Sequence, residues 1–149
     1  RVLKPNGIFY MDDFVGPSRF QWSDEMLDLG TAVRQCLAEE YLANPYQPGA
    51  KLPRQVRRPN MDTMIATDPS EAADSDNILG AVRQFFPDAD IMLTGGVVYN
   101  LALADILNNF SLTPVEPLLR VLMLLDFQAA DHGLTHYAVA LATKPNTML

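Results

Sequence analysis

Runs of apolar residues predict three β-strands along the chain. Residues 8–11 are apolar without polar alternation, which is typical of a strand covered on both faces in the parallel sheet of an α/β fold. Residues 89–94 predict a second strand that stops at two consecutive glycines, and residues 136–143 predict a third that a Lys-Pro pair ends. The first strand runs directly into Asp12 and Asp13, at the strand end where open α/β sheets bind ligands.

Helical spacing of apolar residues predicts the elements between these strands. Residues 23–40 form one amphipathic helix, with Ser23 as its N-cap and acidic residues in its first turn. Residues 41–60 contain four prolines, and this density predicts an irregular loop. Residues 62–73 predict a short helix or turn, and residues 78–86 predict a helix that ends before Pro87.

Composition and charge narrow the class of protein. Of the 149 residues, 48% are hydrophobic and 19% are charged, as in an ordinary globular domain, and the net charge of −7 argues against nucleic-acid binding. No apolar run reaches the roughly 18 residues of a membrane span, so we expect no membrane partner and a cytoplasmic location. The single Cys36 cannot form an internal disulfide, and no residue spacing suggests a metal site.

Three stretches of the sequence resemble one protein family. Residues 3–14 read LKPNGIFYMDDF, residues 15–24 read VGPSRFQWSD, and residues 65–72 read IATDPSEA. They resemble segments of a bacterial branch of the class I S-adenosylmethionine-dependent methyltransferases, in which the first stretch is a turn followed by strand five. The resemblance implies an α/β fold, in which this chain forms the C-terminal part of a Rossmann-like seven-stranded sheet. In that sheet the last strand is antiparallel and lies between strands five and six.

The same resemblance implies methyl transfer from S-adenosylmethionine as the activity of the full-length protein. Such enzymes hold the cofactor on their first half, with a glycine-rich loop and an acidic residue, and this sequence contains no G-x-G. We therefore expect residues 1–149 to be the C-terminal portion of one methyltransferase domain, with the N-terminal cofactor-binding half absent. A chain of this kind is expected to be inactive alone.

The connector between the last two predicted strands is far longer than a hairpin turn, and we interpret residues 97–134 as a helical insertion. The sequence of this insertion predicts two helices, one over residues 97–110 and one from residue 114 or 115 to residue 130. Apolar residues nearly encircle both helices, which predicts burial. Because strand six ends and strand seven begins at the ligand edge, we interpret these helices as a cap over the acceptor site, with a dimer contact, and hence a homodimer, as the alternative.

Three residues are candidates for catalysis. Methyl transfer is an in-line displacement in which the enzyme aligns donor and acceptor, and a base helps where the acceptor is a hydroxyl. Asp12 or Asp13 could take that proton, or both could simply bind backbone N–H groups, and strand alternation argues against both facing the site. His132 and the nearby His136 flank the last strand, where a histidine acts as a base or is merely hydrogen-bonded.

Five residues are candidates for binding the acceptor. Phe20 and Trp22 would form an apolar wall, while Arg19 and Gln21 would supply hydrogen bonds. Alternatively, Trp22 packs against the following helix without contacting a ligand. Tyr99, on the predicted cap, is the fifth candidate, and the adjacent Asn100 is a further one.

The sequence indicates only the chemical class of the acceptor. A basic cluster of Lys51, Arg54, Arg57 and Arg58 either binds an anionic acceptor or offsets the acidic surface. The acidic surface, the tryptophan loop and the apolar cap favour a small-molecule or carbohydrate-like acceptor. An alternative function is that of a non-catalytic partner or degenerate subunit, whose apolar first strand completes the sheet of another chain.

Overall fold

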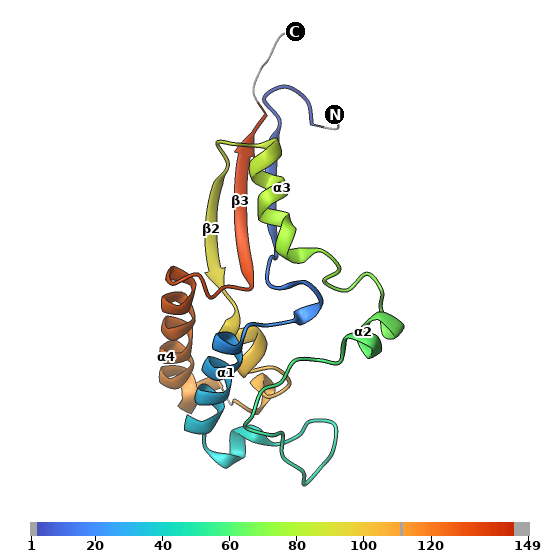
Figure 1. Cartoon of the computed structure of the whole chain (residues 1–149). Helices are drawn as coiled ribbons and strands as arrows, with labels where there is room; N and C mark the ends of the chain where they lie inside the picture. The colour runs from blue at the N-terminus through green and yellow to red at the C-terminus, as the bar shows by residue number, and fades with distance from the viewer. Residues whose placement is uncertain (1–2, 111, 145–149) are drawn as a thin grey trace.

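Three strands form one sheet in the computed structural model, which describes residues 3–110 and 112–144. The strands are β1 (Ile8–Phe14), β2 (Asp90–Gly95) and β3 (Tyr137–Thr143). β3 lies in the middle and is antiparallel to both neighbours (Figure 1). The three predicted strands are therefore confirmed, and so is the placement of an antiparallel last strand between the other two.

The predicted fold class is nevertheless wrong. The described part of the chain holds a small three-stranded sheet in which both strand pairs are antiparallel, and it does not form a seven-stranded Rossmann-like sheet. The expectation that the first strand is covered on both faces is wrong too, because 68% of Ile8 and 63% of Tyr10 is exposed. The apolar run correctly indicated a strand, but apolarity alone does not determine whether this chain covers both of its faces.

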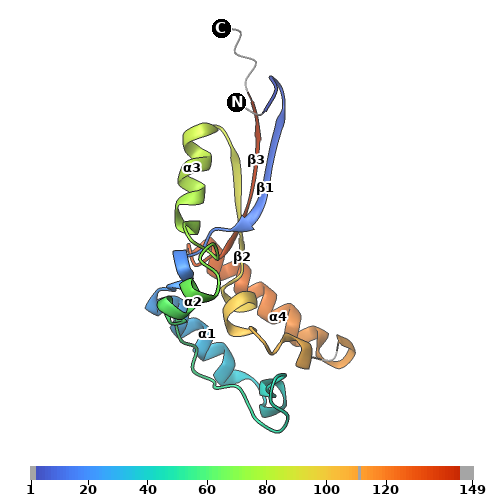
Figure 2. The ribbon, with the colours of Figure 1, turned by 90° about the vertical axis from the view of Figure 1, so that its right-hand side faces the viewer.

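One helix covers one face of the sheet. α3 (Ile78–Phe85) packs against the face that carries the buried Ala138, Ala140 and Ala142 of β3. Alternation along β3 places Tyr137, Val139 and Leu141 on the opposite face. Figure 2 shows that face, here called the open face, without a helix in front of it, while α4 projects beside its lower end.

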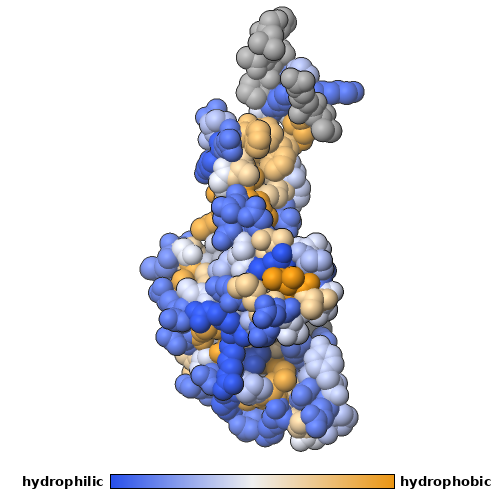
Figure 3. Space-filling view, turned by 45° about the vertical axis from the view of Figure 1, so that its right-hand side comes forward, coloured by the Kyte–Doolittle hydropathy of each residue, from blue (hydrophilic) through white to orange (hydrophobic). Residues whose placement is uncertain are grey.

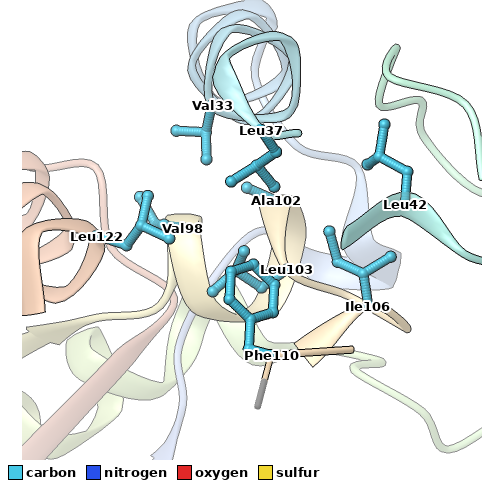
Figure 4. Packing of buried hydrophobic residues seen from close by; sticks show 9 residues of the cluster. All are labelled: Val33, Leu37, Leu42, Val98, Ala102, Leu103, Ile106, Phe110 and Leu122. Atoms are coloured by element: carbon cyan, nitrogen blue, oxygen red, sulfur yellow. The ribbon is translucent and has the colours of Figure 1, made fainter. Parts of the chain in front are cut away.

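The remaining elements form a helical body at the lower end of the sheet (Figures 1 and 2). Its main helices are α1 (Asp24–Cys36) and α4 (Leu112–Asp131), with η4, a π-helical turn (Val97–Ala102), between them. Figure 4 shows the largest core cluster, which these elements share. The shorter elements are η1 (Ser18–Phe20), η2 (Glu39–Leu42), α2 (Met61–Thr67), η3 (Ser75–Asn77) and η5 (Leu107–Asn109).

The predicted helices are confirmed in part. The helix expected over residues 23–40 is α1, and the Ser23 side chain accepts a hydrogen bond from the Met26 N–H as its cap. The helix expected over residues 97–110 is divided into η4 and η5, whereas the second insertion helix is α4. Burial on all sides is wrong for both η4 and α4, since 48% of Tyr99 and 64% of Leu124 is exposed.

Hydrophobic side chains are distributed differently over the surface of the helical body and over that of the sheet and α3. Figure 3 shows a mostly hydrophilic surface on the helical body and hydrophobic side chains gathered on the narrow part formed by the sheet and α3. Within the described residues, no helix is sufficiently long and apolar to cross a membrane.

A buried carboxylate joins the sheet to the helical body. Asp126 of α4 is 2% exposed, and its two oxygens accept hydrogen bonds of 2.8 Å from the backbone N–H groups of Gly96 and Val98. These groups lie at the start of η4, where N–H groups have no partner within the helix. Gly96 has a φ of 108°, and a Cβ on it would come within 2.5 Å of the Tyr137 ring. The chain can therefore turn from β2 into η4 only with glycine here.

We predict that Asp126→Ala lowers the free energy of unfolding by about 2–4 kcal/mol, because it leaves two buried N–H groups without an acceptor. The exposed Asp131 on the same helix provides the control, and Asp131→Ala should change stability by less than about 0.5 kcal/mol. Urea denaturation followed by circular dichroism measures both variants. Equal stability of the two variants would contradict this role of Asp126.

Candidate functional site

Two stretches that carry the family resemblance are held together in the structure, although about fifty residues separate them. The Arg19 guanidinium donates hydrogen bonds to the carbonyl oxygens of Glu71 (3.0 Å) and Pro69 (2.7 Å). The Arg19 N–H also donates to the Ala72 carbonyl, at 2.7 Å. Together these bonds fix the loop after β1 against the loop before α3.

Two serine hydroxyls add to the contact between these loops. Ser75 is buried and donates to the Gly16 carbonyl at 2.8 Å, while Ser18 donates to Asp76 at 2.6 Å. We call the contact between residues 16–20 and 69–76 the loop clasp.

The loop clasp contains a cluster of unusual backbone conformations. Arg19, Phe20 and Ala72 have φ values of 56°, 52° and 45°, in the left-handed region that residues with a Cβ rarely adopt. Such conformations cost about 1–3 kcal/mol each and persist where surrounding contacts enforce them. Strained residues concentrate at binding and catalytic sites, so their presence here favours a site beside them.

A pocket of about 520 Å³ opens beside the loop clasp, within the size range of small-molecule sites. We call it the β1-end pocket, because Asp13 and Phe14 of β1 line it. Among the described residues, three with carboxylates and three with aromatic rings contribute to its walls, and no Lys or Arg does. Its lining residues are Asp13, Phe14, Phe20, Ser70, Glu71, Ala72, Ala73, Asp74, Ser75, Ile78, Asn100 and Tyr137.

Behind the pocket lies a cluster of aromatic rings centred on His136. The His136 ring is stacked on Trp22 with 6.0 Å between ring centroids and lies 5.6 Å from Phe14. Phe14 in turn makes edge contacts with Phe20 and Tyr137, both of which line the pocket. The cluster therefore supports the aromatic wall from behind.

His136 is fully buried and neutral at ordinary pH. None of its surface is exposed, and neither ring nitrogen has a hydrogen-bond partner among the described residues. Burial lowers the pKa of His136 to about 4, although a contact with the Gly96 backbone, outside hydrogen-bonding geometry, opposes the shift in part. A histidine in such surroundings supports the pocket by packing and does not exchange protons with its contents.

The structure separates the two aspartates of β1. Asp13 lines the β1-end pocket, and one of its oxygens accepts a 2.7 Å hydrogen bond from the Phe14 N–H. Asp12 lies on the open face and lines a smaller hollow with Tyr99 and Met123. Only Asp13 is therefore placed at the pocket, as strand alternation predicted, and Tyr99 lies with Asp12 outside it.

The predicted binding residues of the tryptophan loop take different positions. Phe20 lines the β1-end pocket. Arg19 is used by the loop clasp, and the Gln21 amide donates to the carbonyls of Arg19 and Pro59. Trp22 packs against the core cluster that contains Met26, as the alternative interpretation expected.

The remaining candidates lie away from the pocket. His132 is exposed at the end of α4, with its Nδ1 2.8 Å from the Gln128 carbonyl oxygen. The described lining of the pocket contains Asn100 from the insertion helices but no residue of α4, so the described side chains of α4 do not cap this pocket.

Residues of the basic cluster stabilise their own loop and hold it against α1. Lys51 and Arg54 both pair with Glu39 and lower its pKa to about 2. Arg54 also donates to carbonyls at the end of α1, and Arg58 pairs with Asp24 at the start of α1. These contacts favour the structural interpretation of the cluster over anion binding.

Sequence reasoning missed Tyr137 as a residue that shapes the pocket, whereas Asn100 was among the candidates. Asn100 donates a 3.2 Å hydrogen bond to the Tyr137 hydroxyl, and both residues line the pocket. Burial, and then the neighbouring Tyr99, raise the pKa of Tyr137. The position of Tyr137 at the start of the last strand, next to the predicted ligand edge, was the available signal for it.

Comparison of the chain with protein-family models, with curated proteins and with solved structures finds no match. Among the described residues, no three His, Cys, Asp or Glu side chains are grouped so as to hold a metal ion. The residues of the site itself offer carboxylates that can accept hydrogen bonds and aromatic faces on which a ligand can stack.

We predict that the free energy of unfolding falls as the pH drops from about 6.5 to about 4, by up to about 3 kcal/mol from His136 alone. The folded state disfavours the imidazolium, whereas the unfolded state binds the proton with ordinary affinity. His136→Phe should remove this component of the pH dependence, and His132→Gln, at an exposed histidine, should keep it. Urea denaturation at a series of pH values measures the slopes, and parallel slopes for the wild type and His136→Phe would refute the assignment.

Proposed function

We propose that this chain supplies the acceptor side of a methyltransferase that uses S-adenosylmethionine, with a small-molecule or carbohydrate-like acceptor in the β1-end pocket. The observation that carries the proposal is the loop clasp. Two segments that resemble the methyltransferase family, one after β1 and one before α3, meet there and form the wall of one pocket.

The chemistry of the pocket wall supports an acceptor that donates hydrogen bonds. Asp13, Glu71 and Asp74 bring carboxylates to the wall, and carboxylates only accept hydrogen bonds when ionised. Phe14 and Phe20 offer aromatic surfaces on which an apolar ring face can stack. Hydroxyl groups on a compact ring satisfy both requirements.

Asp13 is the residue proposed as the base. One of its oxygens is occupied by the Phe14 N–H, which fixes the carboxylate at the pocket wall. The other oxygen is available to accept the proton of an acceptor hydroxyl while the methyl group is transferred. Asp12, one residue earlier, is on the opposite face and serves as a natural comparison.

We predict that Asp13→Asn lowers the rate of methyl transfer by about a hundred- to ten-thousand-fold, the usual contribution of a positioned base. Asp12→Asn should change the rate much less, because its carboxylate does not reach the pocket. Transfer of a radiolabelled methyl group from S-adenosylmethionine to a panel of polyhydroxylated small molecules, by the product of the complete gene, measures both. Equal losses in the two variants would exclude Asp13 as the base.

We predict that S-adenosylhomocysteine binds the product of the complete gene but not the isolated 149-residue chain. The sequence lacks the glycine-rich loop that such cofactor sites use, so the cofactor residues are expected elsewhere. Calorimetric titration of both proteins tests this. Ordinary affinity of the 149-residue chain would overturn the expectation, and no binding to either protein would remove support for methyl transfer.

A second candidate function is that of a subunit that completes the sheet of another chain, and the outer edge of β1 favours it. Backbone bonds from Val15 to His136 and from Lys144 to Gly7 define the alternation along β1. It follows that the backbone groups of Tyr10 and Asp12 face the outer edge, away from β3. A strand added there would extend the sheet, and an absence of cofactor binding in the titration would favour this function.

A further inference from the structure

An apolar surface remains uncovered on the side of the molecule opposite α3. On the open face of the sheet it includes Ile8, Tyr10, Met92 and Leu141, and on α4 it includes Leu124 and Phe127. These six side chains, here called the apolar corner, are each 49% to 68% exposed. Large exposed apolar patches on soluble domains usually mark interaction surfaces.

The two parts of the apolar corner are continuous. Met123 of α4 lines one hollow with Asp12, Thr94 and Tyr137 of the sheet, and a second hollow with Leu124 and Phe127. Met123 therefore connects the open face to the exposed side of α4. Figure 2 shows the resulting shape, in which the sheet is upright and α4 projects from its lower end on the open side.

The exposed area of the chain is larger than that of a monomer of its mass. The chain exposes 9752 Å², whereas a monomeric globular protein of 16.5 kDa exposes about 7,550 Å². If the eight residues outside the described ranges contributed as much area as an unfolded chain does, an excess of about 1,200 Å² would still remain. A standard interface buries about 800 Å² on each partner, so this excess is sufficient for a stable dimer.

We propose that the apolar corner is the interface with a second copy of this chain, related by a two-fold axis. In such a dimer the open faces of the two sheets pack against each other, as in a sandwich of two sheets. The projecting α4 of each copy then lies against the upper end of the other sheet. None of the six side chains is charged. Asp12 and Asp90 also lie on the open face, Asp12 beside Met123 and Asp90 opposite Leu141.

Two further observations favour a second copy as the occupant. An isologous contact uses the same surface of both copies, so a surface with one sheet arm and one helix arm would meet its own two-fold image. In addition, the described side chains of α4 do not cap the β1-end pocket, which leaves the dimer contact as the role expected for the apolar side of α4. The proposal is independent of methyl transfer.

The test is the mass of the 149-residue chain in solution, measured by sedimentation equilibrium over a wide range of concentration. The wild type should have twice the 16.5 kDa of one chain. Met92→Arg on the sheet and Leu124→Arg on α4 should each raise the dimer dissociation constant by about tenfold or more, because a charge then lies in the centre of the interface. Phe85→Arg is the matched control, since Phe85 is 73% exposed but lies on α3, away from the apolar corner.

Thermal unfolding of each variant verifies that it is folded before its mass is interpreted, and all three substitutions are at exposed positions. A wild-type chain that is monomeric at every concentration would overturn the proposal. So would a dimer that resists both Met92→Arg and Leu124→Arg, or one that Phe85→Arg disrupts equally. Dissociation by the two corner substitutions alone would support it.

Discussion

The hydrogen bonds between Asp126 and the start of η4 are the interaction on which the rest of this structure depends. β2 ends at Gly95, and the chain turns from the sheet into the helical body at Gly95 and Gly96, which have φ values of 86° and 108°. The turn leaves two buried N–H groups that need an acceptor, and burying them without one costs about as much as a lost hydrogen bond each. Only a carboxylate provides one acceptor oxygen for each group without adding a donor.

The position of Asp126 also fixes both sides of α4. Because Asp126 must face η4, the residues one turn before and one turn after it on the same side, Leu122 and Ala130, are buried with it. The side that carries Leu124 and Phe127 is then turned away from the core. The exposed apolar side of α4 is thus a consequence of the same contact that holds the sheet to the helical body.

Local structure could be predicted from the sequence where the signal is local. The apolar runs located all three strands, and Ser23 marked the start of α1 because its hydroxyl satisfies an N–H group of the first turn. Which apolar faces of the strands and helices are covered by other elements could not be predicted in the same way. Ile8 and Leu124 are apolar in a pattern that favours burial, yet the burial partner of an apolar side chain is a non-local property that the pattern does not contain.

The candidate site was predictable to a similar extent. The alternation of a strand separated Asp13 from Asp12, and Phe20, which was expected to form an apolar wall for the acceptor, lines the pocket. Arg19 was expected to bind a ligand because a guanidinium is a good donor, but the nearest acceptors are the carbonyls of Pro69 and Glu71. Such a contact between distant loops can be seen only in the folded structure, and the same is true of the contact between Asn100 and Tyr137.

The β1-end pocket and the apolar corner are on opposite sides of one thin sheet, and this links them physically. Asp13 faces the pocket and Asp12 the open face, and Tyr137 lines both the pocket and the hollow at the corner. A one-residue slip of β1 against β3 would exchange the two aspartates between the faces. Whatever covers Ile8 and Tyr10 on the open face therefore stabilises the register that places the Asp13 carboxylate in the pocket. Association at the corner would accordingly make the pocket more rigid without contacting its contents.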